Sequence, residues 1–178
     1  LDRSAYERDP IAELERVYKT IQSQAKADPA VGQQAREELA KLQKGDAENL
    51  SLWKEFTDVS RTVFERVYSR LHIQFDHWLG ESFYNPMLTG VVQDLQDRGL
   101  AQPSEGAMCI FFADDPDLNG TPFLIQKQDG AFLYATTDLA TIKYRAETFH
   151  PDRIIYVVDS RQQLHFRQLF AAARRWGY

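Results

Sequence analysis

The chain has 178 residues, of which 43% are hydrophobic and 12% aromatic, with a formal charge of −5. This composition supports a globular core and excludes a mainly disordered protein. No apolar run approaches the roughly 20 residues of a membrane helix, and the charged residues 1–20 do not resemble a signal peptide. Cys109 is the single cysteine, so we expect no disulfide partner and a reduced, cytoplasmic protein.

Charge is spread unevenly along the chain. Residues 72–142 carry 2 basic and 10 acidic side chains, whereas residues 143–178 carry 7 basic and 3 acidic ones. An acidic middle suits a cationic ligand, although a solvated acidic face is the simpler alternative. The four histidines are not spaced as metal ligands. The sequence also lacks a phosphate-loop pattern, a dinucleotide glycine fingerprint and a specific Ser-His-Asp arrangement, so we expect no metal site and assign no catalytic residue.

The first part of the chain has the apolar spacing of helices. This spacing predicts helices over residues 10–27, 30–44 and 47–71. Pro10 suits a first helical turn and Asp46 suits an N-cap. Residues 1–71 are therefore expected to form a helical unit that precedes the rest.

The sequence pattern changes after residue 71, where short apolar runs alternate with turns and helical patterns. The runs predict strands at 72–75, 107–112, 123–127, 131–135 and 153–158, with a turn-rich loop at 76–86, a hairpin turn at 128–130, and helices at 87–98, 137–149 and 161–177. From residue 107 onward, this order suits part of a parallel α/β sheet with an insertion.

One strand-to-helix junction carries side chains suited to a cation. Tyr134 and Asp138 lie four residues apart there, and sites in open α/β sheets lie at the carboxyl ends of strands. A carboxylate pairs with an ammonium or a guanidinium, and a tyrosine ring can stack on a flat cation. The alternative is that Thr136, Thr137 and Asp138 only cap a helix.

Two other places carry weaker signals. Gln162 follows the strand predicted at 153–158, and its amide can both donate to and accept from an amino-acid ligand. Its alternative role is to cap the last helix, and the adjacent Gln163 competes with it for contact with a ligand. Glu81 lies in an aromatic-rich loop, where it is either a charged member of the site or a turn residue.

Several strings, in order along nearly the whole chain, resemble the middle of arginyl-tRNA synthetases. The most telling is Tyr-Ala-Thr-Thr-Asp-Leu-Ala at 134–140; the others are at 45–46, 52–56, 75–76, 80–85, 126–130, 144–145, 156–160 and 162–166. The resemblance implies an α/β fold, part of the Rossmann-like catalytic domain of a class I synthetase. Residues 1–71 would be the helical part of an inserted region, and residues 72–178 the α/β part.

The resemblance also implies a function. Enzymes of this family activate L-arginine with ATP and Mg²⁺ and transfer it to tRNA(Arg). In the family, the Tyr and Asp of the motif that matches Tyr134 and Asp138 hold the arginine side chain. A Gln 24 residues after that Asp contacts arginine too, and it matches Gln162. Glu81 and His165 are weaker candidates for the same site.

The chain departs from the family at two signatures. It has no His-x-Gly-His and no Lys-Met-Ser-Lys, the elements that bind ATP phosphates in class I synthetases. Because it also starts at Leu1 and stops after a helical pattern, we expect a central segment that contributes the arginine pocket, holds no cofactor tightly and is inactive alone. The alternatives are a non-catalytic module that binds arginine or a protein, and a different class I synthetase.

Overall fold

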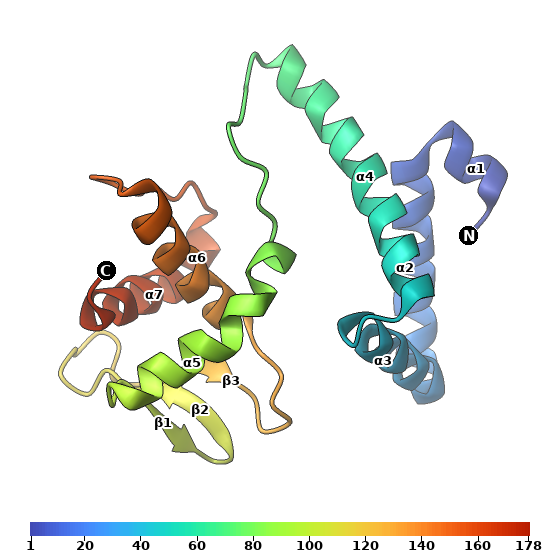
Figure 1. Cartoon of the computed structure of the whole chain (residues 1–178). Helices are drawn as coiled ribbons and strands as arrows, with labels where there is room; N and C mark the ends of the chain where they lie inside the picture. Colours follow the sequence, from blue (N-terminus) through green and yellow to red (C-terminus); the bar gives the residue numbers. More distant parts are fainter. The chain divides into compact units, whose positions relative to one another are not determined.

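The structure is a computed structural model that describes residues 1–178, apart from the side chain of Gln43. It divides into two units, Leu1–Asp76 and His77–Tyr178. The first unit contains only helices, whereas the second combines helices with a small sheet (Figure 1).

Four helices form the first unit: α1 (Arg3–Arg8), α2 (Pro10–Ala27), α3 (Pro29–Gln43) and α4 (Ala47–Arg70). The last three confirm the helices predicted at 10–27, 30–44 and 47–71. Each begins at an aspartate, Asp9, Asp28 or Asp46, whose side chain accepts a backbone N–H of the first turn. A proline at the start of α2 and α3 has no N–H to leave unsatisfied.

A buried carboxylate joins the start of the chain to α2. Glu13 accepts hydrogen bonds from the Asp2 backbone N–H at 2.7 Å and from Arg16 at 2.7 Å. These donors, Arg16 first, lower the pKa of Glu13 to about 2.

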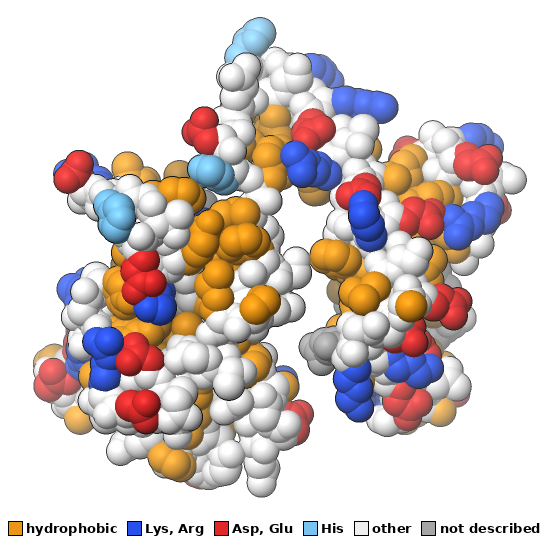
Figure 2. All heavy atoms as spheres, viewed as in Figure 1, with side chains coloured by type: hydrophobic (Ala, Val, Ile, Leu, Met, Phe, Trp, Pro, Cys, Tyr) orange, Lys and Arg blue, Asp and Glu red, His pale blue; other side chains and the backbone are white. Residues whose placement is uncertain are grey.

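Large apolar side chains of the same unit, including Trp53 and Phe64, stay exposed, and Figure 2 shows such orange side chains among charged ones.

In the second unit, one helix packs against several of the other elements. Its elements are η1 (Glu81–Met87), α5 (Leu88–Asp97), β1 (Ala101–Ser104), β2 (Ala107–Ile110), β3 (Phe123–Gln126), α6 (Tyr134–Phe149), η2 (Ser160–Gln162) and α7 (Gln163–Trp176). Helix α6 contacts β3, α5, α7 and η1. The position of α6 is therefore fixed by its packing against these four elements.

The core of the second unit lies between α5, α6, α7 and the sheet. Leu95, Ile125, Leu139 and Leu169 are completely buried there, and apolar burial of this kind is the main favourable contribution to folding. Trp176 is buried too, and its indole N–H donates to an Asp94 carboxylate oxygen at 2.7 Å, so the end of α7 is fixed against α5.

The sheet differs from the parallel one that was expected. Its strands run in the order β1-β2-β3, and both pairs are antiparallel. Strand β1 was not predicted, because Ala-Gln-Pro-Ser has low strand propensity. Pro103 is tolerated since β1 is an edge strand, and Glu105 and Gly106 make the tight turn with positive φ angles of 50° and 81°. The strand expected at 107–112 is shorter and ends at Ile110.

The hairpin turn at 128–130 forms, but the strand predicted at 131–135 does not. The Gly130 N–H donates to the Lys127 carbonyl at 3.0 Å, and the Lys127 N–H donates to Ala131 at 2.9 Å. Only an isolated bridge between Gln126 and Phe132 follows. The chain then turns into α6 at Tyr134, so that helix starts three residues earlier than expected.

Two further predicted strands are absent from the described chain, at 72–75 and at 153–158. The loop expected at 76–86 contains η1. The segment at 153–158 was expected to be buried, yet Ile155 is 75% exposed and Val157 96% exposed. A strand needs a neighbour to pair its backbone groups, and among the described residues neither segment has one.

No helix of the described chain is long and apolar enough to cross a membrane.

Candidate functional site

The start of α6 is anchored to the sheet by a buried threonine. The Thr136 hydroxyl donates to the Ile125 carbonyl of β3 and accepts from the Leu133 N–H at 3.4 Å. Thr136 is completely buried, and Thr137 nearly so. The capping alternative therefore holds for Thr136 but not for Asp138, which lies further into the helix.

Asp138 makes a contact between two helices. Its carboxylate oxygen Oδ2 lies 2.7 Å from Nε2 of His165, in the first turn of α7. Both side chains are about one-third exposed, at 31% and 32%. Among the described residues Asp138 has no other side-chain hydrogen bond, so its second oxygen remains available to a ligand from solvent.

Aromatic rings pack around the His165 member of this pair. The His165 ring lies 5.7 Å from the ring of Phe123 in β3 and 5.2 Å, edge to face, from Phe166. Tyr156 also packs on Phe166, at 5.2 Å. Burial raises the pKa of Tyr156, the charge of Arg145 lowers it, and the nearby Asp138 carboxylate raises it. Tyr156 was expected only as a strand residue, and its place beside Asp138 had no signal in the sequence.

Tyr134 and Gln162 each lie about one helical turn before a member of this pair. Tyr134 begins α6, one turn before Asp138, so both side chains share a face of the helix. It is 71% exposed. Gln162 is exposed at the N-cap of α7, one turn before His165, and makes no capping hydrogen bond there. Its capping alternative therefore does not hold. The convergence of Tyr134, Asp138 and Gln162 on one ligand stays a prediction.

Glu81 is not joined to these residues. It is exposed at the start of η1, and no hydrogen bond or ion pair links it to the other candidates among the described side chains. Helix η1 packs on α6 through Tyr84 and Tyr144. Tyr144 follows Asp138 by six residues, roughly 9 Å along the helix axis.

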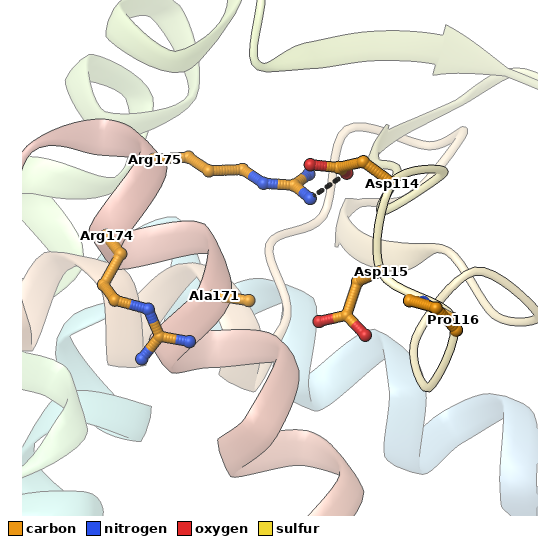
Figure 3. A pocket seen from close by; sticks show the side chains of 6 residues that line it. All are labelled: Asp114, Asp115, Pro116, Ala171, Arg174 and Arg175. Atoms are coloured by element: carbon orange, nitrogen blue, oxygen red, sulfur yellow. Dashed lines mark hydrogen bonds and ion pairs between the residues drawn. The ribbon is translucent and has the colours of Figure 1, made fainter.

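A hollow of about 370 Å³ lies elsewhere in this unit, at the other end of α7. It is lined by Asp114, Asp115, Pro116, Ala171, Arg174 and Arg175 (Figure 3). Arg175 forms an ion pair with Asp114 across it, and Arg167 pairs with Asp117 at 2.5 Å. The basic end of the chain thus neutralises part of the acidic middle. None of the predicted site residues lines this hollow.

No group of three or more His, Cys, Asp or Glu side chains in the described part of the chain is arranged to hold a metal ion.

Comparison with known proteins identifies the family. Residues 2–178 match the family described as "tRNA synthetases class I (R), catalytic domain". The chain belongs to this family. The resemblance to arginyl-tRNA synthetases is therefore confirmed. Of the expected Rossmann-like α/β fold, the coarser part holds: the chain has the fold of a class I synthetase catalytic domain, with helices and a small sheet.

Relatives named arginine–tRNA ligase agree along the chain. The one from Fusobacterium nucleatum is 45% identical over 178 residues, which are all of this chain and 31% of the relative. The one from Rhodopirellula baltica is 55% identical over 142 residues, 79% of this chain and 20% of the relative. The chain thus spans less than a third of the length of these relatives.

A solved arginyl-tRNA synthetase from Plasmodium falciparum has the same fold. It aligns with a TM-score of 0.73 at 29% identity, over 84% of this chain and 26% of that one. A putative arginyl-tRNA synthetase from Campylobacter jejuni, at 17% identity and a TM-score of 0.65 over 82% of this chain and 32% of that one, shares the fold.

Proposed function

We propose that this chain supplies the arginine side-chain pocket of an arginine–tRNA ligase. The observation that carries the proposal is the state of the Asp138 carboxylate, near the start of α6. His165 holds one of its oxygens, and the second oxygen is available to a ligand. A guanidinium is planar and always charged, and a carboxylate is its natural hydrogen-bonding partner. Membership of the arginine family supports this choice of cation.

The neighbouring candidates suit the rest of an arginine side chain. The exposed ring of Tyr134, on the same face of α6, offers a surface for a flat cation. The Gln162 amide is a neutral group that can both donate and accept. Glu81 is kept as a weaker candidate, because among the described side chains no hydrogen bond or ion pair links it to the other candidates.

The whole reaction needs more than this chain. The ligase activates L-arginine with ATP, which enters with Mg²⁺ as substrate, and then transfers it to tRNA(Arg) in the cytoplasm. We infer that the groups that stabilise the phosphates lie in other parts of a full-length synthetase, because the two ATP-binding signatures are absent from these 178 residues. The helical residues 1–71 would belong to an inserted region of its catalytic domain.

We further propose that residues 153–158 become a strand of a Rossmann-like sheet in the full-length synthetase. Ile155 and Val157 are exposed on alternate positions of this segment, whereas Ile154 and Tyr156 are half-buried. Such alternation is typical of a strand with one covered face, and the relatives contain enough further chain to supply its neighbours.

Hydrogen exchange tests this strand. In a full-length synthetase that carries this chain, the amides of Ile155 and Val157 should exchange at least about 100-fold more slowly than in the 178-residue chain, because pairing would protect them. The amide of Gly130, in the hairpin turn, is the matched reference within the same chain. Equal exchange of Ile155 and Val157 in both proteins would contradict the strand.

Amino-acid-dependent exchange of pyrophosphate into ATP tests the function itself. A full-length synthetase that carries this chain should catalyse the exchange with L-arginine and at least about 100-fold less well with citrulline, which has the same shape but no charge for Asp138 to bind. Efficient exchange with another amino acid instead would indicate a different class I synthetase. Absence of exchange with any amino acid would favour the non-catalytic module.

A further inference from the structure

We propose that His165 is a positioning residue that orients the Asp138 carboxylate for arginine. The inference rests on the proposed function, since it matters only if Asp138 binds the guanidinium. Its basis is the 2.7 Å contact between His165 Nε2 and Asp138 Oδ2. An ionised carboxylate only accepts hydrogen bonds, so the imidazole donates from Nε2.

The imidazole is itself held in place. Phe123 of β3 is buried, and its ring lies 5.7 Å from the His165 ring; the Phe166 ring lies 5.2 Å away and nearly perpendicular to the imidazole. The turn before α7 is fixed by Asp159, whose carboxylate accepts the Arg161 N–H at 2.9 Å. The ring thus approaches Asp138 from a packed and capped element, as an orienting group must.

The backbone that carries Asp138, the hydrogen-bond acceptor, is also held in place. Thr136 ties the first turn of α6 to β3, two residues before Asp138. What remains free is the rotation of the carboxylate about its own side-chain bonds, because its exposure leaves room for movement. The hydrogen bond from His165 restricts that rotation and engages only one oxygen. Arginine then binds without the entropic cost of ordering the carboxylate.

This role differs from direct contact with arginine. In the Nε2–H tautomer the imidazole is neutral and its donor is already used by Asp138. A residue that acts through Asp138 loses its influence once Asp138 no longer carries a charge, whereas a residue that touches arginine by itself keeps it. The two roles therefore separate in a double-mutant cycle.

The first test measures KM and kcat for arginine in a full-length synthetase that carries this chain. His165→Ala should raise the KM for arginine about 5- to 10-fold, the range for a partly exposed hydrogen bond to a charged group. Its kcat and its KM for ATP should stay within about twofold. His165→Gln, whose amide can donate from a similar position, should recover most of the loss. His150→Asn, an exposed histidine at the C-terminal end of α6, is the matched control.

The cycle with Asp138→Asn decides the mechanism. In that background His165→Ala should change the KM for arginine by less than about twofold. If His165→Ala raises the KM for arginine about 5- to 10-fold in this background too, His165 contacts arginine itself, which would overturn the positioning role. If His165→Gln raises the KM for arginine as much as His165→Ala does, and the melting temperature also falls, His165 only contributes to packing. That result would overturn the positioning role too.

A spectroscopic measurement separates this inference from the function on which it rests. In ¹⁵N NMR of the 178-residue chain, neutral His165 should be the Nε2–H tautomer, and Asp138→Asn should shift it toward a mixture. An unchanged tautomer ratio would show that the pair does not form, which overturns the positioning role. If the pair forms but Asp138→Asn leaves the KM for arginine unchanged, the failure belongs to the proposed arginine site, and the positioning role falls with it.

Discussion

Replacement of Asp138 by asparagine, in a full-length synthetase that carries this chain, should raise the KM for arginine by about 30-fold and leave the KM for ATP within about twofold. Loss of one partner of a desolvated charge pair costs about 2–5 kcal/mol. We expect the lower end, near 2 kcal/mol or about 30-fold, because the Asp138 side chain is 31% exposed and water screens the pair. Asp138→Ala should have at least as large an effect.

Steady-state pyrophosphate exchange at varied arginine and varied ATP measures both constants. Asp129→Asn is the matched control, because Asp129 is an exposed turn residue whose carboxylate accepts the Ala131 N–H at 3.0 Å, and asparagine can replace it. A parallel rise in the KM for ATP together with a lower melting temperature would indicate misfolding. An unchanged KM for arginine would contradict the site assignment.

The 178-residue chain alone should show no arginine-dependent pyrophosphate exchange above background, at least about 10³-fold below a full-length synthetase at equal concentration. Adenylate formation requires donors placed around the phosphates where negative charge develops, and removal of even one such group typically costs about 10²- to 10³-fold. The chain contains neither phosphate-binding signature of the family. Its acidic middle also opposes phosphate binding, although Arg167 and Arg175 neutralise two of those carboxylates.

Calorimetric titration of the same preparation with arginine gives the necessary companion measurement. Weak arginine binding without exchange fits a pocket that is present but open to water. Folding is checked by circular dichroism before either assay. Exchange well above background from the purified chain would place the phosphate-binding groups within these 178 residues. It would contradict the proposal that those groups lie in other parts of a full-length synthetase.

The longer helices and the identity of the candidate side chains were accessible from the sequence, whereas the short helices α1 and η1 were not. Helices α2, α3 and α4 were predicted nearly to their ends, since apolar spacing, Asp N-caps and first-turn prolines all act within a few residues. The match of Tyr134, Asp138 and Gln162 to one family pattern also needs no coordinates, because it depends only on residue type and spacing.

The strands and the connections of the site depended on the tertiary structure. A strand exists only where a second segment satisfies its backbone groups, so β1 forms opposite β2 despite Pro103, whereas the apolar segment at 153–158 stays unpaired in this chain. The hydrogen bond between Asp138 and His165 joins residues 27 positions apart. It arises because α6 and α7 pack together over β3, and no local pattern of residues encodes that packing.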